Sequence, residues 1–201
     1  MHPNPAFRQT RTERNLDFAR SRGFGILAVN GEAGPVLAHV PFLLSADASH
    51  ADLHLARSNP VICAIPSPAV MAISGPDAYV SPDWYGLADQ VPTWNYIVVH
   101  LRGTLTPLPA DSLRRHLDAL SAEFESRLAP KPAWSSGKMS DGVMDRMMRM
   151  ILPFRLTISS VEGTWKLNQN KPVGARAGVI AALGAAGTQG IATAMRDLPE
   201  D

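Results

Sequence analysis

Strand-forming segments fill the first half of this 201-residue sequence, and helices do not alternate with them in a regular order. Short runs of apolar and β-branched residues, bounded by Gly, Pro and Asn, predict these strands. Asn30-Gly31 and Gly34-Pro35 separate two of them and predict a hairpin with a five-residue loop. Because a doubly wound parallel sheet needs a strict strand–helix–strand order, we expect an α+β fold built on a small barrel. The expected strands cover residues 24–29, 36–44, 53–55, 69–74, 96–106 and 154–159.

Helical segments flank the strands. Thr10 and Glu13 match a capping box, and Gly23 supplies a stop for the helix that they begin. Apolar residues at spacings of three and four predict a second helix, and methionines gather in a third, where they favour core or oligomer packing. Pro153 is expected to end that third helix, and a last helix starts after Asn170. The expected helices cover residues 11–22, 111–128 and 140–151 and a segment beyond residue 170.

The composition changes near the C-terminus, where alanine and glycine dominate. We therefore expect one domain over residues 1–184 and a C-terminal tail over residues 185–201. No segment approaches about 18 consecutive apolar residues, and the N-terminus lacks a basic region followed by an apolar stretch. These features indicate a soluble, cytoplasmic protein without a membrane-spanning segment. Cys63 lies in an apolar run and is expected to be a small buried hydrophobe.

The charge balance and the missing motifs exclude several common functions. Nineteen basic and eighteen acidic residues give a formal charge of +1, so no global field steers the chain toward nucleic acid. The sequence has no phosphate loop, no GxGxxG, no HExxH, no GxSxG and no CxxC pair. His50 and His54 lie four apart with Asp52 between them, and the two histidines suggest a metal at first sight, but no third ligand is close, so we expect no metal site.

An exposed arginine, a hydroxyl and an amide follow one another in the segment from His54 to Pro60. Arg57, Ser58 and Asn59 meet at a turn that opens a helix, and such a turn offers the donors that a phosphate monoester needs. The alternative is structural: Ser58 or Asn59 caps the helix, and Arg57 is a solvated surface charge.

Aromatic residues gather in two stretches, 75–85 and 91–96, that resemble loops more than core strands. Aromatic side chains in loops usually contact a flat ligand or another subunit. Later, residues 165–170 combine an indole, an ammonium and three amides just after a strand, and these donors suit a planar heteroaromatic ligand. They suit turn and cap positions equally well.

Together these blocks resemble the PaiB family. The resemblance rests on His39-Val40-Pro41, the segments 54–60, 75–85 and 91–96, Trp165-Lys166-Leu167-Asn168-Gln169-Asn170, and Arg176-Ala177-Gly178-Val179-Ile180. It covers about residues 3–184. The sequence departs from the family at Asn168, where serine is common, and in its extended tail. Members are described as FMN-binding negative transcriptional regulators, and the implied fold is the FMN-binding split β-barrel with flanking helices.

The resemblance implies FMN as the cofactor and a homodimer that holds FMN in clefts between the subunits. The implied cofactor-binding residues are Arg57 and Ser58 at the phosphate, with Asn59, His39, Thr93, Trp94, Asn95, Lys166 and Gln169 at the rest of the flavin. Lys166, Gln169 and Asn95 are the candidates for the polar edge of the ring.

Two functions stay open at this point. One is a PaiB-type regulator that acts indirectly through flavin or another small molecule, because the near-neutral charge and the lack of a helix-turn-helix pattern argue against direct DNA binding. The other is an FMN-dependent oxidoreductase related to flavin reductases and pyridoxamine-phosphate oxidases. The sequence names no catalytic residue for the second.

Overall fold

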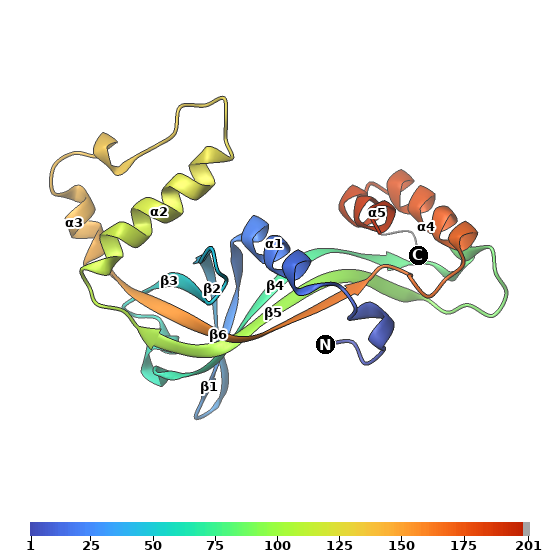
Figure 1. The fold of residues 1–201 in the computed structure, drawn as a ribbon, viewed down its shortest axis with the longest axis horizontal. Helices are drawn as coiled ribbons and strands as arrows, with labels where there is room; N and C mark the ends of the chain where they lie inside the picture. Colours follow the sequence, from blue (N-terminus) through green and yellow to red (C-terminus); the bar gives the residue numbers. More distant parts are fainter. Residues whose placement is uncertain (199–201) are drawn as a thin grey trace. The chain divides into compact units, whose positions relative to one another are not determined.

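Six strands close into a barrel in the computed structural model, which describes residues 1–198 (Figure 1). The order of the strands around the barrel is β1-β2-β3-β6-β5-β4, and helices flank the barrel, so the expected α+β class is confirmed. The strands are β1 (Phe24–Gly31), β2 (Gly34–Leu44), β3 (His50–Ala56), β4 (Ser67–Val80), β5 (Thr93–Pro107) and β6 (Ile151–Lys166).

The strands are longer than the sequence predicts. β1 and β2 pair from Phe24 opposite Pro41 to Gly31 opposite Gly34, which leaves a two-residue connection instead of a five-residue loop. Pro153, which was expected to end a helix, lies inside β6 opposite His54 of β3. The stretches expected as aromatic loops lie partly in β4 and β5. In each case pairing with a neighbouring strand outweighs the local turn signal.

Alternate residues of the strands point into the barrel, as the period of two requires. The burial pattern of β3 alternates strictly between buried and half-buried positions until its last residue. Gly103 on β5 has no space for a side chain, because an added Cβ would collide with the backbone carbonyl of Thr157 on β6. The buried residues of this core include Leu27, Val40, Phe42, Leu53, Met71, Ile73, Leu101, Leu105, Phe154 and Leu156.

The helices are α1 (Thr12–Arg22), α2 (Ser112–Ser126), α3 (Val143–Met148), α4 (Val173–Ala185) and α5 (Gln189–Arg196). Short 3-10 helices are η1 (Pro5–Phe7), η2 (Pro60–Ala64), η3 (Pro82–Tyr85) and η4 (Ser136–Lys138). The predictions of α1, α2 and α4 are confirmed within a few residues. The methionine-rich helix α3 is only six residues long, because Ile151 already belongs to β6. Cys63 is exposed in η2, so its expected burial was wrong.

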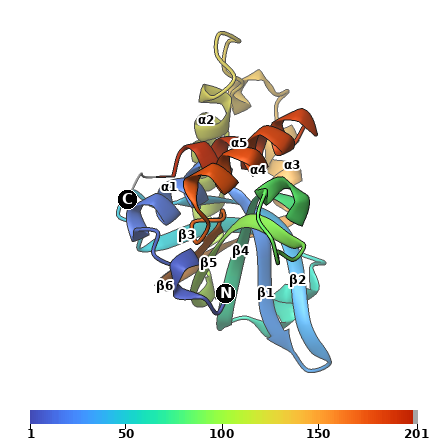
Figure 2. The same ribbon diagram turned by 90° about the vertical axis from the view of Figure 1, so that its right-hand side faces the viewer.

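The described residues form two compact units. The first contains Met1–Asn15, Ser74–Val99 and the residues from Glu162 onward, and the second contains Leu16–Ile73 and His100–Val161. In the first unit α4 and α5 lie side by side, and η3 lies against α4 (Figures 1 and 2). Helix α5 lies within residues 185–201, the segment that the alanine- and glycine-rich composition marks as a C-terminal tail.

Three residues of α5 (Ile191, Ala192 and Met195) are buried. Over residues 1–198, no helix combines the length and the apolar character that crossing a membrane requires.

Candidate functional site

Arg57 follows β3 directly, in the turn that leads to η2. Its backbone N–H donates to the carbonyl oxygen of Met150 at 2.9 Å, and its Nε donates to the carbonyl oxygen of Arg149 at 2.6 Å. These bonds fix the base of an exposed side chain. Among the described residues nothing accepts a hydrogen bond from its two terminal nitrogens. The guanidinium therefore keeps donors in the fork geometry that suits an oxyanion.

The two residues after Arg57 have different surroundings. The side-chain oxygen of Asn59 accepts a hydrogen bond from the backbone N–H of Val61 at 3.0 Å and so caps η2. Ser58 is exposed. Because η2 is a 3-10 helix of five residues, it offers little of the dipole that a longer helix would direct at an anion. Arg57 is therefore the residue of this segment with free charged donors.

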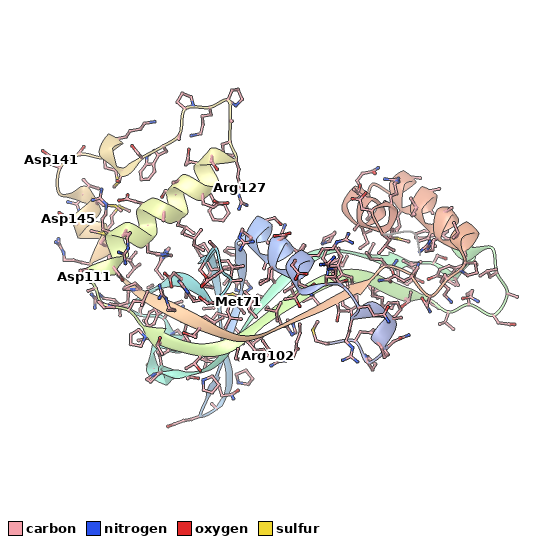
Figure 3. All side chains as sticks on the ribbon, viewed as in Figure 1. Met71, Arg102, Asp111, Arg127, Asp141 and Asp145 are labelled. Carbon is pink, nitrogen blue, oxygen red and sulfur yellow. The ribbon has the colours of Figure 1, made fainter. Side chains whose placement is uncertain are left out.

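Arg57 lines a cavity of about 380 Å³ in the second unit, between the start of α2, α3 and the start of β6. Arg114, Arg149, Asp111 and Asp145 also line it, and Figure 3 shows the two aspartates near the same end of α2. Arg114 is ion-paired within α2. The guanidinium groups of Arg57 and Arg149 are the donors of this cavity that suit an anionic group.

Three expected site residues meet in the first unit. The Nζ of Lys166, the last residue of β6, donates to the hydroxyl of Thr93 and to the backbone carbonyl of Trp94, the latter at 2.6 Å. Burial and the ammonium of Lys171 lower the pKa of Lys166 below its ordinary value. An ammonium has three N–H donors, so Lys166 retains one for a ligand.

Asn95 is buried rather than presented to a ligand. Its side chain has no exposed surface, and its Nδ2 lies 3.4 Å from the Sδ of Met195. Its Oδ1 has no hydrogen-bond partner among the described residues. A ligand at the surface of the first unit reaches Asn95 only if the side chains around it move.

The remaining two expected residues lie apart from these groups. The amide of Gln169 is bonded within its own loop, where its Nε2 donates to the carbonyl of Trp165 and its Oε1 accepts from the N–H of Leu167. His39 is exposed on β2, opposite Ile26 of β1. The structure thus joins Lys166 to Thr93 and Trp94, but it does not bring Asn95, Gln169 or His39 to that group.

A histidine pair lies beside a second cavity of the second unit, which has a volume of about 480 Å³. The Nε2 of His116, on α2, lies 3.2 Å from the Nδ1 of His54, on β3. Burial lowers the pKa of both rings, that of His116 to about 4. Asp52 and Arg155 on the cavity wall form a bidentate ion pair at 2.7 and 2.8 Å. Within residues 1–198 no three metal-ligating side chains converge.

Sequence reasoning did not find Arg149, His116 or Arg155. Each lies far along the chain from the residues that it joins, and none belongs to a motif. In the sequence, His116 lies three residues after Leu113 and so falls on the apolar face of the helix predicted over 111–128. Only the pairing of β3 with β6 and the packing of α2 bring these groups together.

The chain matches one family model and a curated relative over most of its length. The family model is described as "Putative FMN-binding domain" and matches residues 1–160. "Protease synthase and sporulation protein PAI 2" of Bacillus subtilis (strain 168), a member of the PaiB family, is 26% identical over 169 residues. This match covers 82% of the chain and 80% of the relative.

Solved structures show the same fold at low sequence identity. The FAD and heme binding protein from Mycobacterium smegmatis superposes with a TM-score of 0.56 at 20% identity, over 80% of this chain and 73% of that one. A flavocytochrome from Azotobacter vinelandii gives a TM-score of 0.56 at 14% identity, over 82% and 72% of the two chains. These similarities confirm the split β-barrel.

Proposed function

Because the chain belongs to the family of FMN-binding domains, with FMN as its cofactor, we propose that it is a PaiB-like regulator that represses transcription without reading DNA itself. Binding of FMN, or of a small molecule beside FMN, would control its contact with a partner protein. The observation that carries this proposal is the match to the FMN-binding family together with guanidinium donors that are free for a phosphate.

FMN supplies, when bound, a phosphate dianion and a redox-active ring. The donors of the second unit fit the phosphate, because Arg57 is anchored through its Nε and keeps its terminal nitrogens free beside Arg149. Two N–H groups on one guanidinium match two oxygens of a phosphate. We assign the phosphate to Arg57, with the exposed hydroxyl of Ser58 as a further donor.

The donors of the first unit fit the polar edge of a flavin ring held in the cleft that two copies of the chain share in the proposed homodimer. Lys166 is held by Thr93 and Trp94, and no described residue accepts a hydrogen bond from its third N–H. A cation at this edge stabilises negative charge on the ring, which reduction increases. We assign this electrostatic role to Lys166 and the positioning of its ammonium to Thr93.

An exposed aromatic pair on β4 and β5 supports the proposal of a homodimer. Tyr79 and Trp94 are 48% and 55% exposed, and their rings lie edge to face at 6.2 Å. Val91, in the preceding loop, is 73% exposed. Aromatic residues are enriched at the centres of interfaces, so this pair is a suitable contact with a second copy that shares the flavin cleft.

The charges of the chain do not favour DNA as the partner. Three residues join α4 to α5, and Gly187 among them has a φ of 81°, as a helix-turn-helix connection often requires. However, Arg196 is the single basic residue of α5, and the whole chain has a formal charge of +1. Binding to the DNA backbone depends on several lysines and arginines that neutralise phosphates. An indirect action agrees better with these charges.

The cofactor part of the proposal is tested by titrating FMN and riboflavin, which lacks the phosphate. Replacing Arg57 by alanine should weaken FMN by roughly tenfold to a hundredfold, because a charge-assisted bond contributes about 1.5–3 kcal/mol. Riboflavin should bind Arg57→Ala and the wild type equally. Arg146→Ala, which removes an exposed arginine of α3 that does not line the cavity, is the matched control. Equal FMN affinity for Arg57→Ala and the wild type would remove Arg57 from the site.

The regulatory part needs a cellular readout. In cells that lack the chain, the wild type should restore repression of the affected transcripts, whereas Arg57→Ala should not. Neither protein should retard duplex DNA at an ionic strength of about 0.15 M. Full repression by Arg57→Ala would contradict a role for FMN, and sequence-specific retardation of DNA would contradict an indirect action.

A further inference from the structure

Three arginines line a cavity of about 350 Å³ in the first unit, and none of the sites described above includes them. Arg11 directly precedes α1, Arg14 lies in the first turn of α1, and Arg176 lies near the start of α4. Gln169 and Leu198 complete the wall together with the chain before α1. Segments from both ends of the described sequence thus bring positive charge to one cavity.

Arg14 is held in a fixed position. Its guanidinium carbon lies 4.6 Å from the centre of the Trp165 ring, and its Nη2 donates to the backbone carbonyl of Asp197 at 3.4 Å. The indole is itself fixed, because it is buried and its Nε1 donates to the Oδ1 of Asn15 at 2.8 Å. An arginine stacked in this way loses little conformational freedom when it binds an anion.

The positive charge of the cavity is poorly compensated. Arg176 is half-buried, and no described residue forms a side-chain hydrogen bond or ion pair with it. Arg11 pairs with Glu13 at 3.4 Å, but the two side chains are 86% and 72% exposed, so this pair is weak and exchangeable. Among residues 1–198, the solvated Arg11–Glu13 pair is the one ion pair that these three arginines form.

We propose that this cavity binds the phosphate group of a small phosphorylated molecule. A monocarboxylate has two oxygens, which one guanidinium fork satisfies, whereas a phosphate monoester presents three terminal oxygens to three arginines. The volume leaves space for an organic group beyond the phosphate. Arg176 and Arg14 contribute the main donors. Arg11 breaks its ion pair with Glu13 and pairs with the phosphate instead.

The phosphate group bound in this cavity belongs to a molecule other than FMN. The FMN phosphate is assigned to Arg57 in the second unit, and Arg57 does not line this cavity. The cavity would then report the level of a phosphorylated molecule to the regulator that the proposed function describes.

Isothermal titration of the FMN-saturated protein with inorganic phosphate, then with methyl phosphate, tests the site at constant ionic strength. Sodium acetate is the comparison ligand. Arg176→Gln and Arg14→Gln should each weaken phosphate binding by about tenfold or more. Arg196→Gln removes an exposed arginine of α5 that does not line the cavity, and it should leave phosphate binding unchanged. FMN affinity should be the same in all four proteins.

Several results would overturn the proposal. They are an absence of phosphate binding, equal binding of acetate, and an equal loss in Arg196→Gln and Arg176→Gln. If phosphate competes with FMN and Arg176→Gln weakens FMN, these arginines hold the flavin phosphate and the separate site is refuted. If Arg14→Gln unfolds because its stacking on Trp165 is lost, the phosphate affinity of Arg176→Gln tests the site by itself. Should the protein bind no FMN, the phosphate titration is still readable, so the two proposals fail separately.

Discussion

Replacing His116 should remove a loss of stability at acid pH, because the folded protein holds this histidine in its neutral form. The side chain is 6% exposed, and its Nε2 lies 3.2 Å from the Nδ1 of His54. Burial, with a smaller contribution from His54, lowers the pKa of His116 from 6.5 to about 4. In the unfolded chain the same ring accepts a proton near its ordinary pKa.

The sign follows from proton linkage. Between pH 6.5 and about pH 4 the unfolded chain binds more protons than the folded protein, so the free energy of unfolding falls as the pH falls. The difference between the two pKa values corresponds to about 3 kcal/mol in total. About 2 kcal/mol of this is lost between pH 7 and pH 5, and almost none above pH 7, where the ring is neutral in both states.

Urea unfolding at pH 7 and pH 5, followed by circular dichroism, measures this loss. The decrease in unfolding free energy should be smaller by about 2 kcal/mol in His116→Gln than in the wild type. His39→Gln is the matched control, because this histidine is exposed on β2, and its decrease should equal that of the wild type. Equal decreases in His116→Gln and the wild type would refute the buried, neutral histidine.

Three further predictions follow from the packing and the proposed site. Gly103→Ala should destabilise the protein by about 1–3 kcal/mol in urea, since its Cβ collides with the β6 backbone, whereas Gly137→Ala, which has space, should not. Lys166→Met should lower the FMN reduction potential by about 30 mV, or ~1.4 kcal/mol for two electrons, and an unchanged potential would place Lys166 away from the ring. Light scattering should give about twice the chain mass, and serine at Tyr79 and Trp94 should shift it toward the monomer; a wild-type monomer would contradict the shared cleft.

Local sequence signals were sufficient to predict the helices whose period and ends depend only on their own residues. The apolar spacing in 111–128 predicts α2, and the Gly23 stop marks the end of α1, because helix period and termini are local properties. The strand boundaries depended instead on pairing partners. Pro153 has no N–H to donate, yet β6 continues through it because residues on both sides pair with β3.

The residues of the candidate site also differ in whether the sequence alone could identify them. Arg57 could be proposed from a turn with three adjacent polar residues, and its exposure agrees with that proposal. Its anchor, Arg149, could not be proposed, because a backbone carbonyl carries no sequence signal. Asn95 was a plausible ligand by residue type, but the sequence does not show that its side chain lies under Met195.

The identity of the bound flavin tests the central claim most directly. Protein purified without added cofactor should show flavin absorbance, and mass spectrometry of the compound released by heat should identify FMN in an amount comparable to the chain. Riboflavin added to the stripped protein should not restore binding to the same level. A purified protein without flavin that also fails to bind added FMN, or one that releases only FAD, would contradict the account.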